Sequence, residues 1–386
     1  MRDIILRWVG LLFVAALFLA ACQRPGAPAT ATAPAAQPTP TTAPSPTVQA
    51  ATATPQPMGT PTAPAKKKEV IIGYAAPGLV GGQRDILNGF LKHATEKGWR
   101  VVVTNSGGDP QKQINQIEDF IAQGVDAIVA VPDDSRAICA AVEAAKRAKV
   151  PFYTIDRAPI GCVVNMTVLS DNYLAGQQAG EAVIEYLKKK YGSPKGKVLE
   201  ITGNLGQNVA QLRGGGFQDV IKKYPDVQLI TKAGDWDADK GQAIVRDVVS
   251  ANPDLDAIYM HSDAVYMPGT LAVLEQLGRK FKRDEPNHIF LASVDCNPVG
   301  VQAIRDGWAD MCSSQPIPDF GIIVNFIEKE LNGETITEGT VTQPDALWSP
   351  ATIEKTDVGF QLLLRTSPVT IDNVNDPRLW ANQVQQ

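Results

Sequence analysis

The sequence lacks the short motifs that mark most hydrolases and nucleotide-dependent enzymes. Its 386 residues contain no GxSxG nucleophile elbow, no Walker phosphate loop and no GxGxxG fingerprint. Histidine is scarce: His93, His261 and His288 form no pair with metal-ligand spacing and no local motif with serine or cysteine. We therefore expect no enzymatic activity, no metal site and no cofactor.

Cysteine is scarce as well, with five residues and no CxxC pair, so a zinc site is not expected. Cys22 stands apart near the N-terminus, and the other four are Cys139, Cys162, Cys296 and Cys312. Two interpretations remain open for these four. Sequence neighbours pair as disulfides, 139 with 162 and 296 with 312, or all four are packed free thiols.

Charged and aromatic residues are almost absent between residues 23 and 65. Arg24 is the one charge there, and the 43 positions hold 11 Pro, 10 Thr and 12 Ala but no aromatic residue. Such a composition cannot bury enough apolar surface to fold, and its prolines favour an extended spacer. We expect residues 22–68 to form a disordered linker.

A signal peptide is predicted for residues 1–21, where a basic start leads into a short apolar run that closes on small residues. The segment Leu19-Ala20-Ala21-Cys22 resembles a lipoprotein lipobox. The resemblance implies cleavage before Cys22 and a lipid on its thiol. We expect the mature chain to be extracytoplasmic and lipid-anchored to the cell membrane, in the periplasm or on the outer face.

The remaining chain, residues 69–386, is acidic. It carries 30 Lys and Arg against 40 Asp and Glu, a net charge of −10. An acidic domain argues against nucleic acid as a partner. About 320 residues are enough for two hydrophobic cores rather than one.

Continuous apolar segments alternate with amphipathic segments of helical spacing along this part of the chain. Ala127–Val131 is one such predicted strand, and the predicted helix after Asp109 has isoleucines and a phenylalanine at helical intervals. This alternation favours parallel sheets covered by helices on both faces. It runs through two serial halves, so we predict an α/β fold with two Rossmann-like lobes.

Polar residues follow the predicted strands of both halves. Val150–Arg157 reads as a buried strand that ends on Asp156 and Arg157, an acceptor pair beside a rigid donor fork. In open α/β sheets, ligands bind beyond the carboxyl ends of the strands. We expect a cleft between the halves that also receives the strand-end residues Trp236, Ser262, Asp263, Asp295 and Gln315.

Several blocks, taken in order, resemble the type I periplasmic binding proteins of the ribose-binding group. They are Pro151–Arg157, Arg213-Gly-Gly-Gly-Phe217, Asp235-Trp236-Asp237, Ser262-Asp263, Asp295 and Gln315. The resemblance covers about residues 69–345. It implies that Asp156, Arg157, Arg213, Trp236, Ser262, Asp263, Asp295 and Gln315 contact a sugar.

One departure concerns the first strand–helix loop, where the family carries asparagine and paired aromatic residues. Here the loop is Pro77-Gly-Leu-Val-Gly-Gly-Gln83, which leaves Gln83, with Arg84, as the candidate ligand residues. One stacking wall is therefore missing. The ligand is expected to differ from a simple pyranose held between two rings: a furanose, a polyol, a modified sugar or another small polar solute.

The resemblance also implies a domain organisation with a three-strand hinge. We expect an N-terminal lobe from residues 69–170 and 315–346 and a C-terminal lobe from residues 171–314. Residues 347–386 would form a hinge-crossing segment and a C-terminal tail. The crossings are expected near residues 169–173, 313–316 and 344–348.

The function implied is that of a monomeric solute-binding lipoprotein. It would capture a sugar-like molecule in the cleft, close by a hinge motion and deliver the molecule to an ABC transporter permease. A ligand sensor that presents a small signal to a membrane receptor is the first alternative. A secreted carbohydrate-active enzyme is the second, and turnover of a bound sugar would distinguish it.

Overall fold

The computed structural model describes residues 69–383, which lie within one compact unit, Lys66–Gln386. The predicted signal peptide, the linker and the lipidation site Cys22 lie outside the described residues. Among the helices of residues 69–383, none is long and apolar enough to cross a membrane.

The first lobe is built on an eight-stranded sheet in the order β11-β12-β13-β5-β4-β3-β1-β2. Its first five strands are parallel, and a helix follows each of the first three. They are β1 (Ile71–Ala76), β2 (Arg100–Asn105), β3 (Ala127–Ala130), β4 (Phe152–Ile155) and β5 (Met166–Ser170), with α1 (Gly81–Glu96), α2 (Pro110–Gln123) and α3 (Cys139–Ala148). A later part of the chain adds η1 (Ile317–Ile322), α9 (Ile323–Leu331), β11 (Gly339–Val341), β12 (Ala351–Thr356) and β13 (Gly359–Leu364).

The second lobe is built on a six-stranded sheet in the order β14-β10-β9-β8-β6-β7. Its strands are β6 (Gly196–Thr202), β7 (Val227–Ala233), β8 (Leu255–Met260), β9 (Phe290–Asp295), β10 (Met311–Ser314) and β14 (Ser367–Val369). Its helices are α4 (Asn172–Tyr191), α5 (Asn208–Ile221), α6 (Ala238–Ala251), α7 (Asp263–Gln276), α8 (Pro298–Arg305) and α10 (Trp380–Gln383).

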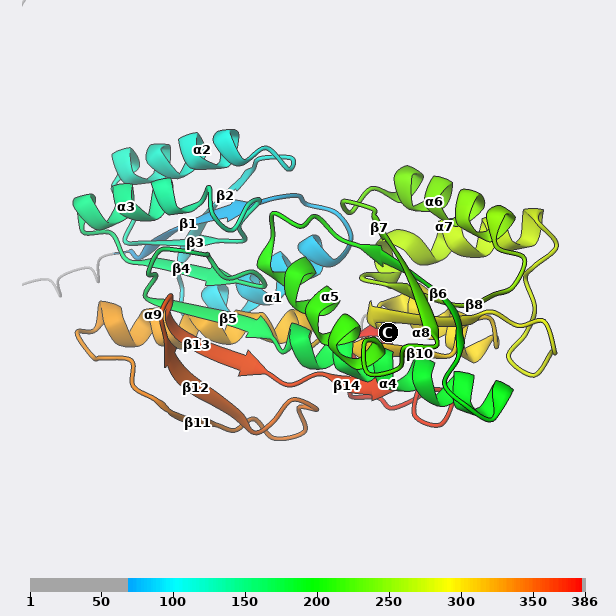
Figure 1. Cartoon of the computed structure of the whole chain (residues 1–386). Helices are drawn as coiled ribbons and strands as arrows, with labels where there is room; N and C mark the ends of the chain where they lie inside the picture. Colours follow the sequence, from blue (N-terminus) through cyan, green and yellow to red (C-terminus); the bar gives the residue numbers. More distant parts are fainter. Residues whose placement is uncertain (1–68, 384–386) are drawn as a thin grey trace, which may run out of the picture. The chain divides into compact units, whose positions relative to one another are not determined.

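Helices cover both faces of each sheet, as the continuous apolar strands predict. In the first lobe α2 and α3 pack on one face, while α1 and α9 pack on the other (Figure 1). In the second lobe α4 and α5 cover one face, and α6, α7 and α8 cover the other. The strands β3, β4, β5, β8 and β10 are buried along their whole length. The α/β fold with two lobes is confirmed, although antiparallel edge strands make both sheets mixed.

Local signals in the sequence set the helix ends. Asp109 accepts hydrogen bonds from the backbone N–H groups of Gln111 and Lys112 and so begins α2, with Pro110 at the first helical position. Gly124 ends the same helix with a φ of 70°, a conformation that costs glycine little.

The chain passes between the lobes three times. The crossings join β5 to α4, β10 to η1, and β13 to β14 at residues 364–367. The first two agree with the predicted positions. The third prediction, residues 344–348, is wrong, because the hairpin of β12 and β13 stays in the first lobe and β13 pairs in parallel with β5 from Phe360 to Leu364.

Both predicted cysteine pairs are disulfides, and the free-thiol interpretation is wrong. Cys139 is bonded to Cys162 in the first lobe, and Cys296 is bonded to Cys312 in the second. The second bridge joins the residue after β9 to β10, next to the strand-end residue Asp295.

Candidate ligand-binding site

A cavity of about 420 Å³ lies beyond the carboxyl ends of the strands and receives side chains from both lobes. The first lobe contributes residues from the β1–α1 loop, α1, the end of β4 and η1. The second lobe contributes residues from α5, α7, the start of α6 and the ends of β7, β8 and β9. The lining consists of Val80, Gly81, Gly82, Gln83, Ile86, Asp156, Arg157, Val209, Arg213, Trp236, Ala238, Ser262, Ala264, Val265, Asp295 and Ile317.

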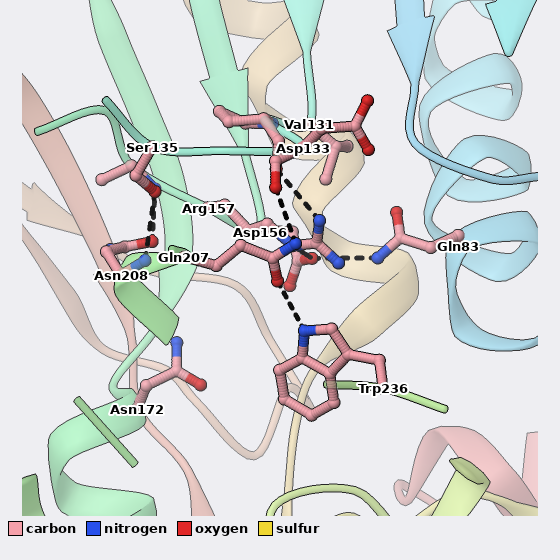
Figure 2. A network of polar contacts seen from close by, with 12 residues as sticks. Gln83, Val131, Asp133, Ser135, Asp156, Arg157, Asn172, Gln207, Asn208 and Trp236 are labelled. Atoms are coloured by element: carbon pink, nitrogen blue, oxygen red, sulfur yellow. Dashed lines mark hydrogen bonds and ion pairs between the residues drawn. The ribbon is translucent and has the colours of Figure 1, made fainter. Parts of the chain in front are cut away.

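Asp156 and Arg157 form the polar wall of the first lobe. The Arg157 Nε lies 3.5 Å from the Asp156 Oδ2, and the Arg157 Nη1 donates to the backbone oxygen of Pro132 at 3.0 Å. Gln83 donates from its Nε2 to the same Asp156 oxygen at 3.1 Å (Figure 2). Burial raises the pKa of Asp156, against the opposing effect of Arg157, and burial lowers the pKa of Arg157.

Arg213 and Asp295 form the matching polar wall of the second lobe. The Arg213 Nη1 lies 3.1 Å from the Asp295 Oδ1, and the Arg213 Nε donates to the Asn172 Oδ1 at 2.8 Å. Ser262 donates from its hydroxyl to the Asp295 Oδ2 at 2.5 Å. Arg213 also donates to the backbone oxygen of His261. The guanidinium is thus fixed from several sides.

Trp236 is the one aromatic side chain among the described residues of the lining. Its backbone N–H donates to the Tyr266 hydroxyl at 2.9 Å, and its Nε1 donates to the Gln207 Oε1 at 2.6 Å. The Arg213 Cζ lies 5.8 Å from the centroid of its ring, within the range of a cation–π contact. The ring packs on Gly203, where a Cβ would come within 1.8 Å of it.

The structure brings seven of the ten predicted ligand residues together around this cavity: Gln83, Asp156, Arg157, Arg213, Trp236, Ser262 and Asp295. Five of them, Asp156, Arg157, Trp236, Ser262 and Asp295, follow predicted strands, whereas Arg213, in the middle of α5, is implied by the family resemblance alone. Gln83 was expected from its loop alone. That these side chains bind a ligand stays a prediction.

Three predicted residues do not line the cavity. Arg84 follows Gln83 by one helical position, so it turns away to the surface, where its Nε lies 3.8 Å from Asp85. Asp263 is fully buried below the cavity and accepts from the Asn297 backbone and the Ser293 hydroxyl; burial, then Asp295, raises its pKa well above the usual range. Gln315 lines a different cavity, at the hinge.

Sequence reasoning missed the residues that join the lobes beside the site. Gln207 donates from its Nε2 to the Asp133 backbone oxygen at 2.8 Å. Asn208 donates from its backbone to the Ser135 hydroxyl at 3.1 Å and accepts at its Oδ1 from Ala158 (Figure 2). These residues lie in a loop and a first helical turn rather than at a strand end. Their one signal is the polar pair Gln207-Asn208 at the start of α5.

Two lobes joined by three crossings, with a polar cleft between them, define a two-lobed solute-binding architecture. A family model described as a periplasmic binding protein domain matches residues 72–334, and the chain belongs to this family. The family resemblance read from the sequence is therefore confirmed.

Individual relatives include several sugar-binding proteins. The ribose import binding protein RbsB of Salmonella typhimurium is 30% identical over 250 residues, which are 64% of this chain and 80% of the relative. The galactofuranose-binding protein YtfQ of Escherichia coli is 28% identical over 292 residues, covering 69% of this chain and 89% of the relative.

Solved structures show the same fold. A galactofuranose binding protein superposes with a TM-score of 0.69 at 22% identity, covering 82% of this chain and 99% of the other. The periplasmic binding component of an arabinose ABC transporter from Shewanella sp. ANA-3 gives a TM-score of 0.68 at 21% identity, with 82% and 97% covered.

Proposed function

We propose that this protein captures a sugar or sugar-like polar molecule in the cleft between its lobes and delivers it to an ABC importer. The observation that carries the proposal is the pair of buried ion pairs, Asp156–Arg157 and Arg213–Asp295, which line one cavity from opposite lobes. The names of its relatives, which include ribose and galactofuranose import or binding proteins, support the same function.

The chemistry of the four charged groups suits neighbouring hydroxyls. Each carboxylate accepts hydrogen bonds, and each guanidinium donates them in a fixed plane. Two acidic and two basic groups leave the wall without formal net charge. A neutral polyhydroxylated ligand therefore fits better than an ionic one. Trp236 offers its ring to a C–H face of such a ligand.

Capture in this cleft requires no covalent step. A ligand that touches both polar walls makes more contacts when the lobes are together, so its binding favours the closed arrangement. We propose that a permease recognises this arrangement, and that the protein acts as a monomer.

Anchoring at the membrane rests on the lipobox-like segment before Cys22. The proposed lipid would hold the folded unit outside the cytoplasm on a proline-rich tether. Cys22→Ser should leave the protein unlipidated, so that it moves from the detergent phase to the aqueous phase on phase partitioning. Partitioning of the variant like the wild type would contradict the anchor and leave sugar capture untouched.

The central test is a thermal-shift screen of the purified protein against pentoses, hexoses, polyols and nucleosides, followed by calorimetry. A compound that binds the native state raises the midpoint by mass action. We expect a saturable shift with at least one sugar and no chemical change in the recovered sugar. No shift with any member, or turnover of a bound sugar, would refute the proposal.

A further inference from the structure

Much of the cavity is aliphatic rather than aromatic. Val80, Ile86 and Ile317 come from the first lobe, around the first turns of α1 and the start of η1. Val209 and Val265 come from the second lobe. None of these side chains has a hydrogen-bonding group, so none of them can pair with a hydroxyl.

The loop before α1 leaves the Val80 end of this aliphatic wall open to solvent. Val80 lines the cavity and yet is 79% exposed, and its neighbour Leu79 is exposed as well. A Cβ at Gly81 would meet no atom within 4 Å, and a Cβ at Gly82 would meet only the Ile317 Cδ1 at 3.7 Å. The wall therefore has room beside Val80, and Val80 presents apolar surface to solvent, whereas Ile86, Ile317 and Val209 are buried.

These observations bear on the ligand class, and the argument rests on the proposed function. A sugar with a hydroxyl on every carbon would press some of them against side chains that cannot pair with them, which costs binding free energy. We propose that the ligand is an amphipathic sugar, either a deoxy sugar with a methyl group or a small alkyl or aryl glycoside. Its hydroxyls face the ion pairs, and its apolar group covers Val80 at the end of the wall that Ile86 and Ile317 also line.

Matched pairs of sugars test this class. Thermal shift and calorimetry compare D-galactose with D-fucose, D-glucose with D-quinovose, D-ribose with 5-deoxy-D-ribose, and each parent with its methyl glycosides. We expect the apolar member of at least one pair to bind about tenfold or more tightly, the discrimination typical of one methyl group in an apolar pocket.

Variants locate the preference. Val80→Ser changes an exposed side chain that lines the wall, and should reduce the preference at least about threefold. Val299→Ser, an exposed valine on α8 outside the cavity, is the matched control and should leave it unchanged. If every sugar that binds prefers its fully hydroxylated member, the inference is wrong and sugar capture stands. If no sugar binds, both the proposed function and this inference are refuted.

A second inference concerns Gln207, whose side-chain amide makes one hydrogen bond through its nitrogen and another through its oxygen. Its Nε2 donates to the Asp133 backbone oxygen of the first lobe at 2.8 Å, and its Oε1 accepts from the Trp236 Nε1 at 2.6 Å (Figure 2). Only 5% of the residue is exposed. An indole nitrogen can only donate and a carbonyl can only accept, so the orientation of this amide is fixed by its partners.

Gln207 therefore connects the ring proposed to stack on the ligand with a contact between the lobes. If the lobes separate, the bond to Asp133 breaks and the amide is free to turn away from the indole. We infer that Gln207 is a positioning residue, which holds Trp236 in its ligand-facing orientation when the lobes are together.

Two substitutions of Gln207 test this role. Gln207→Glu keeps an acceptor for the indole but has no donor for Asp133, and Gln207→Met removes both bonds. Association and dissociation are followed on a biosensor surface that carries the protein, a readout independent of Trp236, with the sugar of the matched set that gives the largest thermal shift. We expect both variants to dissociate about tenfold faster, with association changed less than about threefold.

A double-mutant cycle with Trp236→Phe, which lacks the indole N–H, isolates the pair. We expect Gln207→Met to accelerate dissociation clearly less in the Trp236→Phe background than in the wild type. Gln228→Glu, on the exposed side of β7, is the control for the added charge and should leave both rates unchanged. Unchanged dissociation in both Gln207 variants, or full additivity in the cycle, would overturn the inference.

Discussion

Asp156, Trp236 and Asp295 share an unusual backbone conformation. Their φ angles are 65°, 59° and 96°, in the region that non-glycine residues rarely adopt. The cost is on the order of 1 kcal/mol or more for each, and the surrounding hydrogen bonds must hold it. The Asp156 N–H donates to Val168 at 2.9 Å, and the Trp236 N–H donates to Tyr266. Strain of this kind at three residues that line one cavity supports the proposed site.

At these residues the charged pairs should control affinity. Asp156→Ala and Arg213→Ala each leave a buried partner unpaired, so each should weaken binding of a sugar by about 2–4 kcal/mol. Calorimetry measures the loss, and thermal unfolding checks that the variants fold. Arg84→Ala, at the surface beside the site, is the control and should bind as the wild type does. Wild-type affinity in both site variants would remove the site assignment.

The sequence predicted the polar residues of the site where a strand ends and could not predict the ones that support them. Asp156 and Asp295 follow apolar strands, so topology alone places them at one edge. Asn172 contacts Arg213, and Gln207 contacts Asp133, each far away along the chain. A local sequence pattern cannot predict such long-range contacts. Asp263 also follows a strand, yet it is turned into the core as the first residue of α7.

At the scale of elements, His288 connects the loop before β9 with Asp310, the residue that precedes β10. Its Nδ1 faces the Phe281 backbone oxygen and its Nε2 faces the Asp310 Oδ2, both at 2.8 Å. Both neighbours are acceptors, so both ring nitrogens carry protons and the ring is charged. Burial lowers the pKa of His288, but the hydrogen bond to Asp310 and its charge outweigh burial and leave the pKa raised.

A raised pKa in the folded state predicts a pH-dependent contribution to stability. The contribution of His288 is complete below the ordinary pKa of 6.5 and is lost as the pH rises through the higher folded value. The loss of unfolding free energy in His288→Gln should therefore be largest in mild acid and shrink toward alkaline pH. Urea unfolding of both proteins at about pH 6, 7.5 and 9 measures it. A difference that stays constant or grows with pH would contradict the charged ring.

Elements in the last part of the chain were the hardest to predict. The hairpin of β12 and β13 has polar residues on one side, and its sequence predicts a crossing segment instead. Its place in the first sheet depends on β13 pairing with β5, almost two hundred residues earlier. Such long-range pairing has no signature in a local pattern.

Across the whole molecule, separate parts of the chain converge on the backbone of Asp295. Its carbonyl accepts from the Gln315 N–H at the second crossing, at 3.3 Å, and from the Trp380 Nε1 in the C-terminal tail, at 3.0 Å. Trp380 itself is buried. The disulfide of Cys296 adds a covalent link one residue away. Asp295, a residue of the proposed site, is thus hydrogen-bonded to the hinge and to the tail and directly precedes a disulfide.

The two disulfides should therefore differ in their effect on sugar affinity. They close segments of 23 and 16 residues, and loop-closure entropy in the unfolded chain gives each a stabilisation of about 3 kcal/mol. Replacing Cys139 and Cys162 with serine should lower the unfolding free energy by about that amount and leave sugar affinity unchanged, because neither residue lines the cavity. Replacing Cys296 and Cys312 should lower stability similarly and also weaken binding, because Asp295 loses its neighbouring constraint. Urea unfolding and calorimetry on both double variants separate the two effects, and equal affinities would show that the bridge beside Asp295 stabilises the fold without positioning the site.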